Sequence, residues 1–187
     1  VWPLDPRGRE GLGERLAAYA VKAAREAKLH TSWLDPDGEY EEVLTTYARA
    51  LVDDAALRAP VDAVASRIAA AGVSNSLAQL ALRLCSPGVP DTYPGAELWH
   101  QCLVDPDNRS AVDYAARRAA LRRIQEPGAG EAAVRALRDH WDDGLLKLLV
   151  LHRGLELRAR HAELFAAGDY GPVDGGAHAI AFVRSRG

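Results

Sequence analysis

Apolar residues recur every three or four positions through most of this sequence, and that spacing constrains the fold more than any other feature. Between Gly11 and Leu29, one such series places its members on a single face of a helix. The residues around them are mostly Ala, Glu, Lys and Arg, which are good helix formers. We therefore expect a mainly α-helical chain. The members of this first series are Leu12, Leu16, Ala20, Ala23 and Ala27.

Breaks in the pattern divide the rest of the chain into further predicted helices. Asp35 followed by Pro36 suits an N-cap with proline at the first helical position, which predicts a second helix from there to about Leu51. A third helix is expected to open at Pro60 and to close at Gly72. The remaining predicted helices are one capped by Ser76 and three over residues 113–125, 131–141 and 143–158.

Four segments lack helical periodicity. Residues 1–10 are rich in Pro, Gly and charge and are expected to form a loop. Residues 89–93 are strand-length, although the prolines there disfavour ordinary central pairing. Residues 94–112 are predicted to form a long loop, and long ordered loops are often functional. Residues 178–183 are predicted to form a strand that has no pairing partner in the sequence.

Charge and cysteine content exclude several classes of protein. A formal net charge of −3 and an isoelectric point near 6.1 give no electrostatic reason to expect binding to nucleic acid or to an anionic membrane. We found no run of about 18 apolar residues, so no membrane span is expected. Cys85 and Cys102 cannot form a disulfide framework, which suits a reducing cytoplasm.

The sequence also has features of a piece of a longer protein. It contains no methionine and begins Val1-Trp2-Pro3, and no processing signal precedes that start. A lone strand over residues 178–183 would be unusual in a complete domain. We therefore expect an internal fragment.

Acidic residues crowd the segment 91–113. Carboxylate pairs perform glycoside chemistry, whereas crowded loop acids are also commonly solvated or paired with an arginine such as Arg109, and both alternatives stay open. A calcium loop beginning at Asp105 fails, because Ser110 and Ala116 stand where glycine and glutamate are needed. The histidines show no close metal-ligand spacing, so no metal site is expected. The crowded acids are Asp91, Glu97, Asp105, Asp107 and Asp113.

A longer motif points to one family. Residues 88–97 read Gly-Val-Pro-Asp-Thr-Tyr-Pro-Gly-Ala-Glu and resemble the G-x-P-x-x-Y-x-G-x-E stretch at the eighth strand of the α-amylase superfamily barrel. The continuation over 97–99, 103–109 and 112–114 looks like the version found in maltooligosyl trehalose synthases. Other segments similar to that family follow in family order: 22–28, 31–33, 40–41, 75–79, 147–148, 164–165, 168–170 and 181–184.

This resemblance implies a fold and a domain organisation. Residues 1–165 would be the C-terminal slice of a (β/α)8 barrel, comprising a helical insertion, the last barrel strand and the last helix. Residues 166–187 would begin a C-terminal β-domain. Pro94, His100 and Ser110 depart from the Gln, Asp and Arg expected of the family, and all three concern substrate contacts near the eighth strand.

The resemblance also implies a reaction. The family is an isomerase of trehalose biosynthesis, which opens the reducing-end α-1,4 bond of a maltooligosaccharide and reattaches the freed glucose through an α,α-1,1 bond. The superfamily's nucleophile, acid and stabilising aspartate follow strands four, five and seven, so no catalytic residue is expected in this chain and the chain alone is expected to be inactive. No cofactor is implied. The implied partners are a maltooligosaccharide substrate and, in the same pathway, a maltooligosyl trehalose trehalohydrolase.

Active sites of such barrels lie at the carboxyl ends of the strands, so the loop after residue 93 should face the sugar. Arg109 could bind sugar hydroxyls or could pair with Asp105 or Asp113 and only shape the loop. Trp33 could stack on a pyranose ring or could belong to the core. The expected substrate-binding residues are Tyr93, Asp107, Asn108, Arg109 and Trp33.

Two competing interpretations remain. One is a slice of another glucan hydrolase or transglycosylase of the same superfamily. The other is a free-standing helical module that binds sugar or protein without catalysis, which should melt cooperatively by itself.

Overall fold

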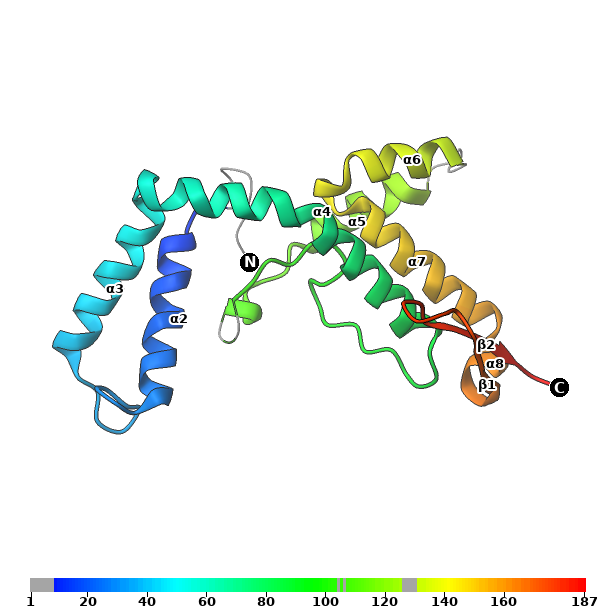
Figure 1. Ribbon diagram of the computed structural model, residues 1–187, viewed down its shortest axis with the longest axis horizontal. Coiled ribbons are helices and arrows are strands. Elements are labelled where there is room, and N and C mark those ends of the chain that lie inside the picture. The colour runs from blue at the N-terminus through cyan, green and yellow to red at the C-terminus, as the bar shows by residue number, and fades with distance from the viewer. Residues whose placement is uncertain (1–8, 104, 106, 126–130) are drawn as a thin grey trace. The chain divides into compact units, whose positions relative to one another are not determined.

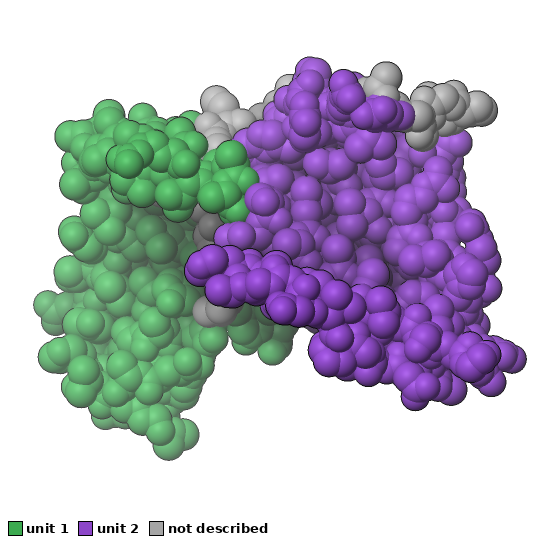
Figure 2. All heavy atoms as spheres, turned by 45° about the vertical axis from the view of Figure 1, so that its right-hand side comes forward, with its two compact units in different colours: residues 1–72, 101–111 green, residues 73–100, 112–187 purple. Residues whose placement is uncertain are grey.

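A computed structural model of the chain describes residues 9–103, 105, 107–125 and 131–187. Helices dominate it, and its one small sheet has two strands (Figure 1). The prediction of a mainly α chain is therefore confirmed. The chain divides into two compact units, residues 1–72 with 101–111 and residues 73–100 with 112–187 (Figure 2), and each is described by itself. The loop expected over residues 1–10 falls almost wholly outside the described residues, as do Val104 and Pro106 of the family-like segment.

The first unit is built on an antiparallel helix pair, α2 (Leu12–Ala27) and α3 (Gly38–Asp53), which lie side by side in Figure 1. The pair buries small and aliphatic side chains, and an exposed ion pair joins Arg49 to Glu14 at 2.7 Å. Both helices were predicted, but the cap of α3 was wrong. Asp37 rather than Asp35 accepts the hydrogen bond from the Tyr40 amide, at 3.0 Å. The buried residues are Leu12, Ala17, Ala48 and Val52.

Helix α4 (Ala55–Cys85) is continuous where two helices were predicted. It begins after Asp54, whose carboxylate accepts a hydrogen bond from the Ala56 amide at 2.7 Å. Pro60 therefore lies inside the helix, and so do Gly72 and Ser76. A mid-helix glycine costs only about 1 kcal/mol relative to alanine, and the helix-favouring Ala-rich stretch before Gly72 outweighs that cost.

The N-terminal half of α4 exposes an apolar stripe made of Leu57, Val61, Val64 and Ile68. By length and composition alone, α4 passes the test for a membrane-crossing helix, with a mean hydropathy of 1.2 over the best window. A core helix of a soluble protein passes the same test, so one such helix is weak evidence.

The second unit has its core on α7 (Leu145–Arg160). One cluster joins α7 to α5 (Tyr114–Gln125), through Ala120 and Ile124 against Leu145, Leu148 and Leu149. A second cluster joins Leu151 to Leu80 and Leu84 of α4. The unit also contains α6 (Glu131–Asp139), the 3-10 turn η2 (Trp141–Asp143) and α8 (Ala162–Ala167). The three helices predicted for this region are confirmed, with shifted ends.

The sheet pairs β1 (Asp169–Val173) with β2 (Ala181–Ser185) in antiparallel register. The expected C-terminal strand is present but is not alone, because β1 was missed. Gly171 and Pro172 hid it, since both residues are uncommon inside strands. The strand-length segment 89–93 forms no strand in the structure. Within the described residues it pairs with no other strand, and a strand is defined by such pairing; the backbone hydrogen bond from the Ala96 amide to the Tyr93 oxygen belongs to a turn.

Candidate functional site

In the first unit, an ion pair fixes the loop residues Gln101, Leu103 and Asp107 to α2. Arg15 donates two hydrogen bonds to the Asp107 carboxylate, both at 2.7 Å, and a third to the backbone oxygen of Gln101 at 2.6 Å. The Leu103 amide donates to the same carboxylate at 2.6 Å. The pKa of Arg15 is raised, first by the hydrogen bonds to Asp107. Asp107 is thus engaged by protein donors, and its side chain is 12% exposed.

The next two residues of this loop, Asn108 and Arg109, are not held by Arg15 as Asp107 is. They belong to the short 3-10 turn η1 (Asp107–Arg109). The side-chain oxygen of Asn108 is buried and has no hydrogen-bond partner among the residues that the structure describes. Arg109 pairs with Asp105 at 2.5 Å, one of the two ion pairs considered for it, yet its side chain remains 71% exposed. Arg109 can therefore contact a ligand while Asp105 partly neutralises its charge.

The turn between α2 and α3 carries Trp33. This residue is 57% exposed, so a core role within the described chain is wrong. The guanidinium of Arg25 lies 4.9 Å from the centre of its ring. Arg25 also donates two hydrogen bonds to the Glu41 carboxylate, at 2.7 and 2.6 Å. These bonds, together with one from the Thr31 hydroxyl, lower the pKa of Glu41 to about 2.

The structure does not bring Trp33 and Asp107 together. Arg15, which binds Asp107, lies in the first turn of α2, whereas Trp33 follows the end of that helix. Because the Trp33 ring lies against Arg25, the separation along the helix from Arg15 is about 15 Å at 1.5 Å per residue. These two expected substrate-binding elements can therefore contact one ligand only if that ligand is extended.

Tyr93 belongs to the second unit, where it is 53% exposed. Its family-like segment is anchored by backbone and side-chain contacts rather than by strand pairing. Arg117 of α5 binds the Glu97 carboxylate at 2.9 Å and the Gly95 backbone oxygen at 2.8 Å. The Gly95 amide, at a φ of 94°, donates to Glu97 at 3.0 Å. Glu97 is thus a structural partner of Arg117, as expected of a crowded loop acid.

Further cations hold both ends of the same segment. Arg158 of α7 donates to the Gly88 backbone oxygen at 2.9 Å, and Arg83 of α4 donates to the backbone oxygen of Asp91. Lys147 donates to the Leu98 backbone oxygen at 2.9 Å. The pKa of Lys147 is lowered, mainly because burial disfavours its charged form. These contacts fix residues 88–98, which form neither helix nor strand and turn at residues 94–97.

The most important anchoring residues were missed by sequence reasoning. Arg15, Arg25 and Arg117 each lie in helical sequence, where an arginine predicts only a solvated surface position. Their partners are 92, 16 and 20 residues away, and local periodicity does not reveal such pairs. Among the residues that the structure describes, no group of three or more His, Cys, Asp or Glu side chains could hold a metal ion.

Comparison with known proteins shows which proteins share this sequence and fold. The chain is 38% identical, over 188 aligned residues and 98% of its length, to a Mycobacterium tuberculosis protein named as a maltooligosyl trehalose synthase. The same enzyme from Arthrobacter ramosus has a solved structure that matches 92% of this chain at 40% identity, with a TM-score of 0.75. The chain belongs to the maltooligosyl trehalose synthase family.

Another crystal structure of a maltooligosyl trehalose synthase covers 97% of the chain with a TM-score of 0.79 and 28% identity. No protein-family model matches the chain. The chain spans only about a fifth of the length of the relatives it matches, 22% of the Mycobacterium tuberculosis protein and 24% of this solved chain. The recognition made from the motif at residues 88–114 is confirmed.

Proposed function

We propose that this chain is part of an isomerase that forms a terminal α,α-1,1 bond from the reducing-end α-1,4 bond of a maltooligosaccharide. The observation that carries this proposal is the 38% identity over 98% of the chain to a protein named for that product. In the proposed reaction, a carboxylate nucleophile displaces the reducing-end glucose, and the 1-hydroxyl of that glucose then attacks the glycosyl–enzyme bond. The glucose must turn between the two steps while water is excluded.

We infer a supporting role for this chain in that reaction. Its segment 88–97 would complete the barrel as the last strand, residues 1–165 would belong to the barrel and its helical insertion, and residues 166–187 would begin the β-domain. The anchoring at Gly88 and Asp91 supports this, because residues 89–93 are fixed without being helical and could pair with a neighbouring strand. The hairpin of β1 and β2 supports the β-domain assignment.

The substrate contacts we propose are Tyr93, Asn108, Arg109 and Trp33. Tyr93, Arg109 and Trp33 are all more than half exposed. Asp107 would act by holding the loop, since its carboxylate is engaged by Arg15 and Leu103. The nucleophile, the acid and the stabilising aspartate would come from other parts of the enzyme.

The test uses the full-length enzyme with maltohexaose. We expect loss of reducing ends without release of shorter reducing sugars, and a product whose terminal disaccharide is trehalose. A maltooligosyl trehalose trehalohydrolase, the proposed pathway partner in the cytoplasm, should then release trehalose from that product. A gain of reducing ends would contradict the proposal and would favour a glucan hydrolase of the same superfamily.

A further inference from the structure

Trp33 stands out in the first unit because it is exposed yet fixed in orientation. A free surface tryptophan would sample several rotamers, but the guanidinium of Arg25 lies over this ring at 4.9 Å from its centre. Two aliphatic neighbours on the same turn are also exposed, Leu29 at 80% and Leu34 at 98%. The turn therefore presents an aromatic side chain with further apolar surface beside it.

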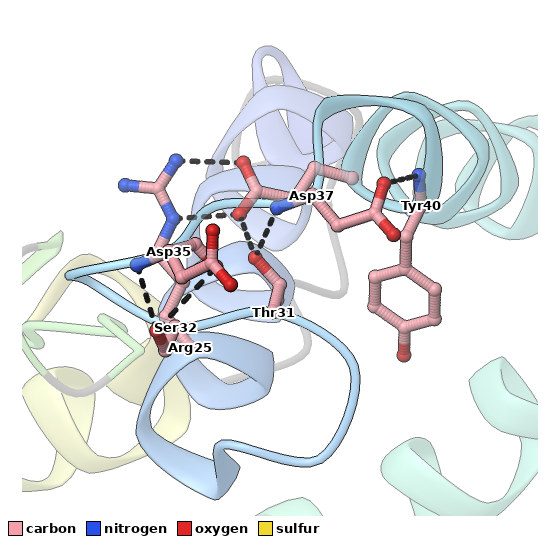
Figure 3. Close-up of polar contacts among 7 residues, drawn as sticks. Arg25, Thr31, Ser32, Asp35, Asp37 and Tyr40 are labelled. Atoms are coloured by element: carbon pink, nitrogen blue, oxygen red, sulfur yellow. Dashed lines mark hydrogen bonds and ion pairs between the residues drawn. The ribbon is translucent and has the colours of Figure 1, made fainter.

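A chain of hydrogen bonds holds the guanidinium of Arg25 in place (Figure 3). The two hydrogen bonds from Arg25 to Glu41 fix the plane of the guanidinium. Glu41 also accepts a hydrogen bond from the Thr31 hydroxyl at 2.6 Å, and that hydroxyl accepts one from the Asp37 amide at 3.0 Å. Thr31 is 3% exposed, whereas the side chains of Arg25 and Glu41 remain 26% and 13% exposed, so only the Thr31 end of this chain of contacts is shielded from water.

The remainder of the turn is equally constrained. The Asp35 amide donates to the Ser32 hydroxyl at 2.9 Å, and the Ser32 amide donates to the backbone oxygen of Asp35 at 3.1 Å (Figure 3). Both residues that flank Trp33 and Leu34 are therefore tied to each other. Nothing in this network needs Trp33 itself, which leaves the indole available for a ligand.

We propose that Trp33 stacks on a glucose ring of the maltooligosaccharide, with Arg25 as the positioning residue that holds the indole ready. A pyranose presents a face of C–H groups, which packs on an aromatic face and removes apolar surface from water. Glu41 offsets the charge of Arg25, so the support behind the ring is planar and neutral overall. This inference rests on the proposed function for the identity of the ligand.

The geometry also gives Trp33 a role in selecting substrates by chain length. The Trp33 ring packs on Arg25, which lies about 15 Å along α2 from Arg15, the residue that binds the turn Asp107–Arg109 with the proposed contacts Asn108 and Arg109. A short maltooligosaccharide bound at that turn would not reach the indole, whereas a long one would. Trp33 should therefore contribute to binding of long substrates and not to the chemical step.

The experiment compares maltotriose with maltoheptaose in the full-length enzyme. For Trp33→Ala we expect the KM of maltoheptaose to rise about 10-fold, as roughly half of an aromatic side chain no longer buries apolar surface. The KM of maltotriose and both kcat values should change by less than about 2-fold. Trp33→Phe should keep the maltoheptaose KM close to the wild-type value, because phenylalanine can still stack on the sugar. Arg25→Gln should raise only the maltoheptaose KM. Tyr47→Ala, an equally exposed aromatic on α3, is the matched control and should change neither KM.

Each outcome separates this inference from the proposed function. If trehalose-ended product forms but Trp33→Ala has the wild-type KM for both sugars, the stacking role is overturned and the isomerase stands. If the wild type forms no such product, yet maltoheptaose quenches tryptophan fluorescence in the wild type and not in Trp33→Phe, the stacking role stands and the isomerase falls. An equal rise in both KM values, with a lower melting temperature, would make Trp33 merely structural and would overturn the inference.

Discussion

The guanidinium of Arg15 binds both oxygens of the Asp107 carboxylate at 2.7 Å, although the two residues are 92 positions apart in the chain. Through this pair, a helix near the start of the chain sets the course of a loop beyond its midpoint. The Asp107 side chain is 12% exposed and Arg15 is 29% exposed, so water screens the pair less than it would at an open surface. The loop that carries Asn108 and Arg109 therefore depends on α2.

Replacing Arg15 should loosen that loop more than it unfolds the protein. Arg15→Ala removes three hydrogen bonds, two of them to the Asp107 carboxylate, a loss of about 1–3 kcal/mol. The Leu103 amide should then exchange with solvent about 10-fold faster or more, as measured by hydrogen–deuterium exchange. In Arg15→Lys, the exchange rate of the Leu103 amide should lie between those of the wild type and Arg15→Ala, because an ammonium cannot bind both carboxylate oxygens in the same way.

The control for this prediction is Arg49→Ala. It breaks the more exposed ion pair with Glu14 on the same helix pair, which should contribute little to stability because solvent screens it. Unchanged exchange at Leu103 in Arg15→Ala would show that the loop is held by other contacts.

This ion pair marks the limit of what the sequence could reveal about the site. The motif at residues 88–114 was enough to recognise the family and the loop, because its residues are contiguous. The partner of Asp107 could not be found, because Arg15 lies on a helix whose surface arginines look alike in sequence. The same holds for Arg25, whose position behind Trp33 depends on the turn geometry.

Glu41 should make stability depend on pH at the acid end. Its folded pKa is lowered from 4.5 to about 2, chiefly by the hydrogen bonds from Arg25 and then by that from Thr31. The stabilisation is therefore present above pH 4.5 and is lost as the pH falls towards 2. A carboxyl-carbon NMR titration should give a midpoint near 2 for Glu41. Thr31→Val should move that midpoint up, and an ordinary midpoint in the wild type would refute the ion pair.

The fold was predictable where apolar residues repeated at helical spacing over several turns. The helices 12–27 and 145–160 followed from the spacing of their apolar residues. The boundary placed at Gly72 was wrong, because a single glycine signals a break only when the surrounding residues do not favour a helix. The partner of the C-terminal strand was missed for a different reason, namely that pairing between β1 and β2 is a tertiary property that Gly171 and Pro172 obscure.

Two glycines should respond to alanine substitution with opposite signs. Gly144 has a φ of 76°, and an added Cβ would lie 3.1 Å from the Trp99 backbone nitrogen, so Gly144→Ala should destabilise the protein by about 1–3 kcal/mol. Gly72 lies inside α4 with no atom within 4 Å of an added Cβ, so Gly72→Ala should stabilise it by about 1 kcal/mol. Thermal melts of the two variants test both signs, and a lower melting temperature for Gly72→Ala would argue against a continuous α4.

Arg109 is the residue on which the proposed substrate contacts of the loop can be decided. Its ion pair with Asp105 is 2.5 Å long, but the Arg109 side chain is 71% exposed, and such pairs stabilise a protein by about 0–1 kcal/mol. Arg109→Ala should therefore leave the melting temperature of the full-length enzyme almost unchanged. If Arg109 donates to sugar hydroxyls in the transition state, kcat/KM should fall by about 5- to 150-fold, which corresponds to about 1–3 kcal/mol. Asp105→Asn is the matched variant, because it breaks the same ion pair and keeps the guanidinium, so it should retain most of the activity. Equal losses in both variants would assign the ion pair a role in shaping the loop, and wild-type activity in Arg109→Ala would remove this residue from the substrate site.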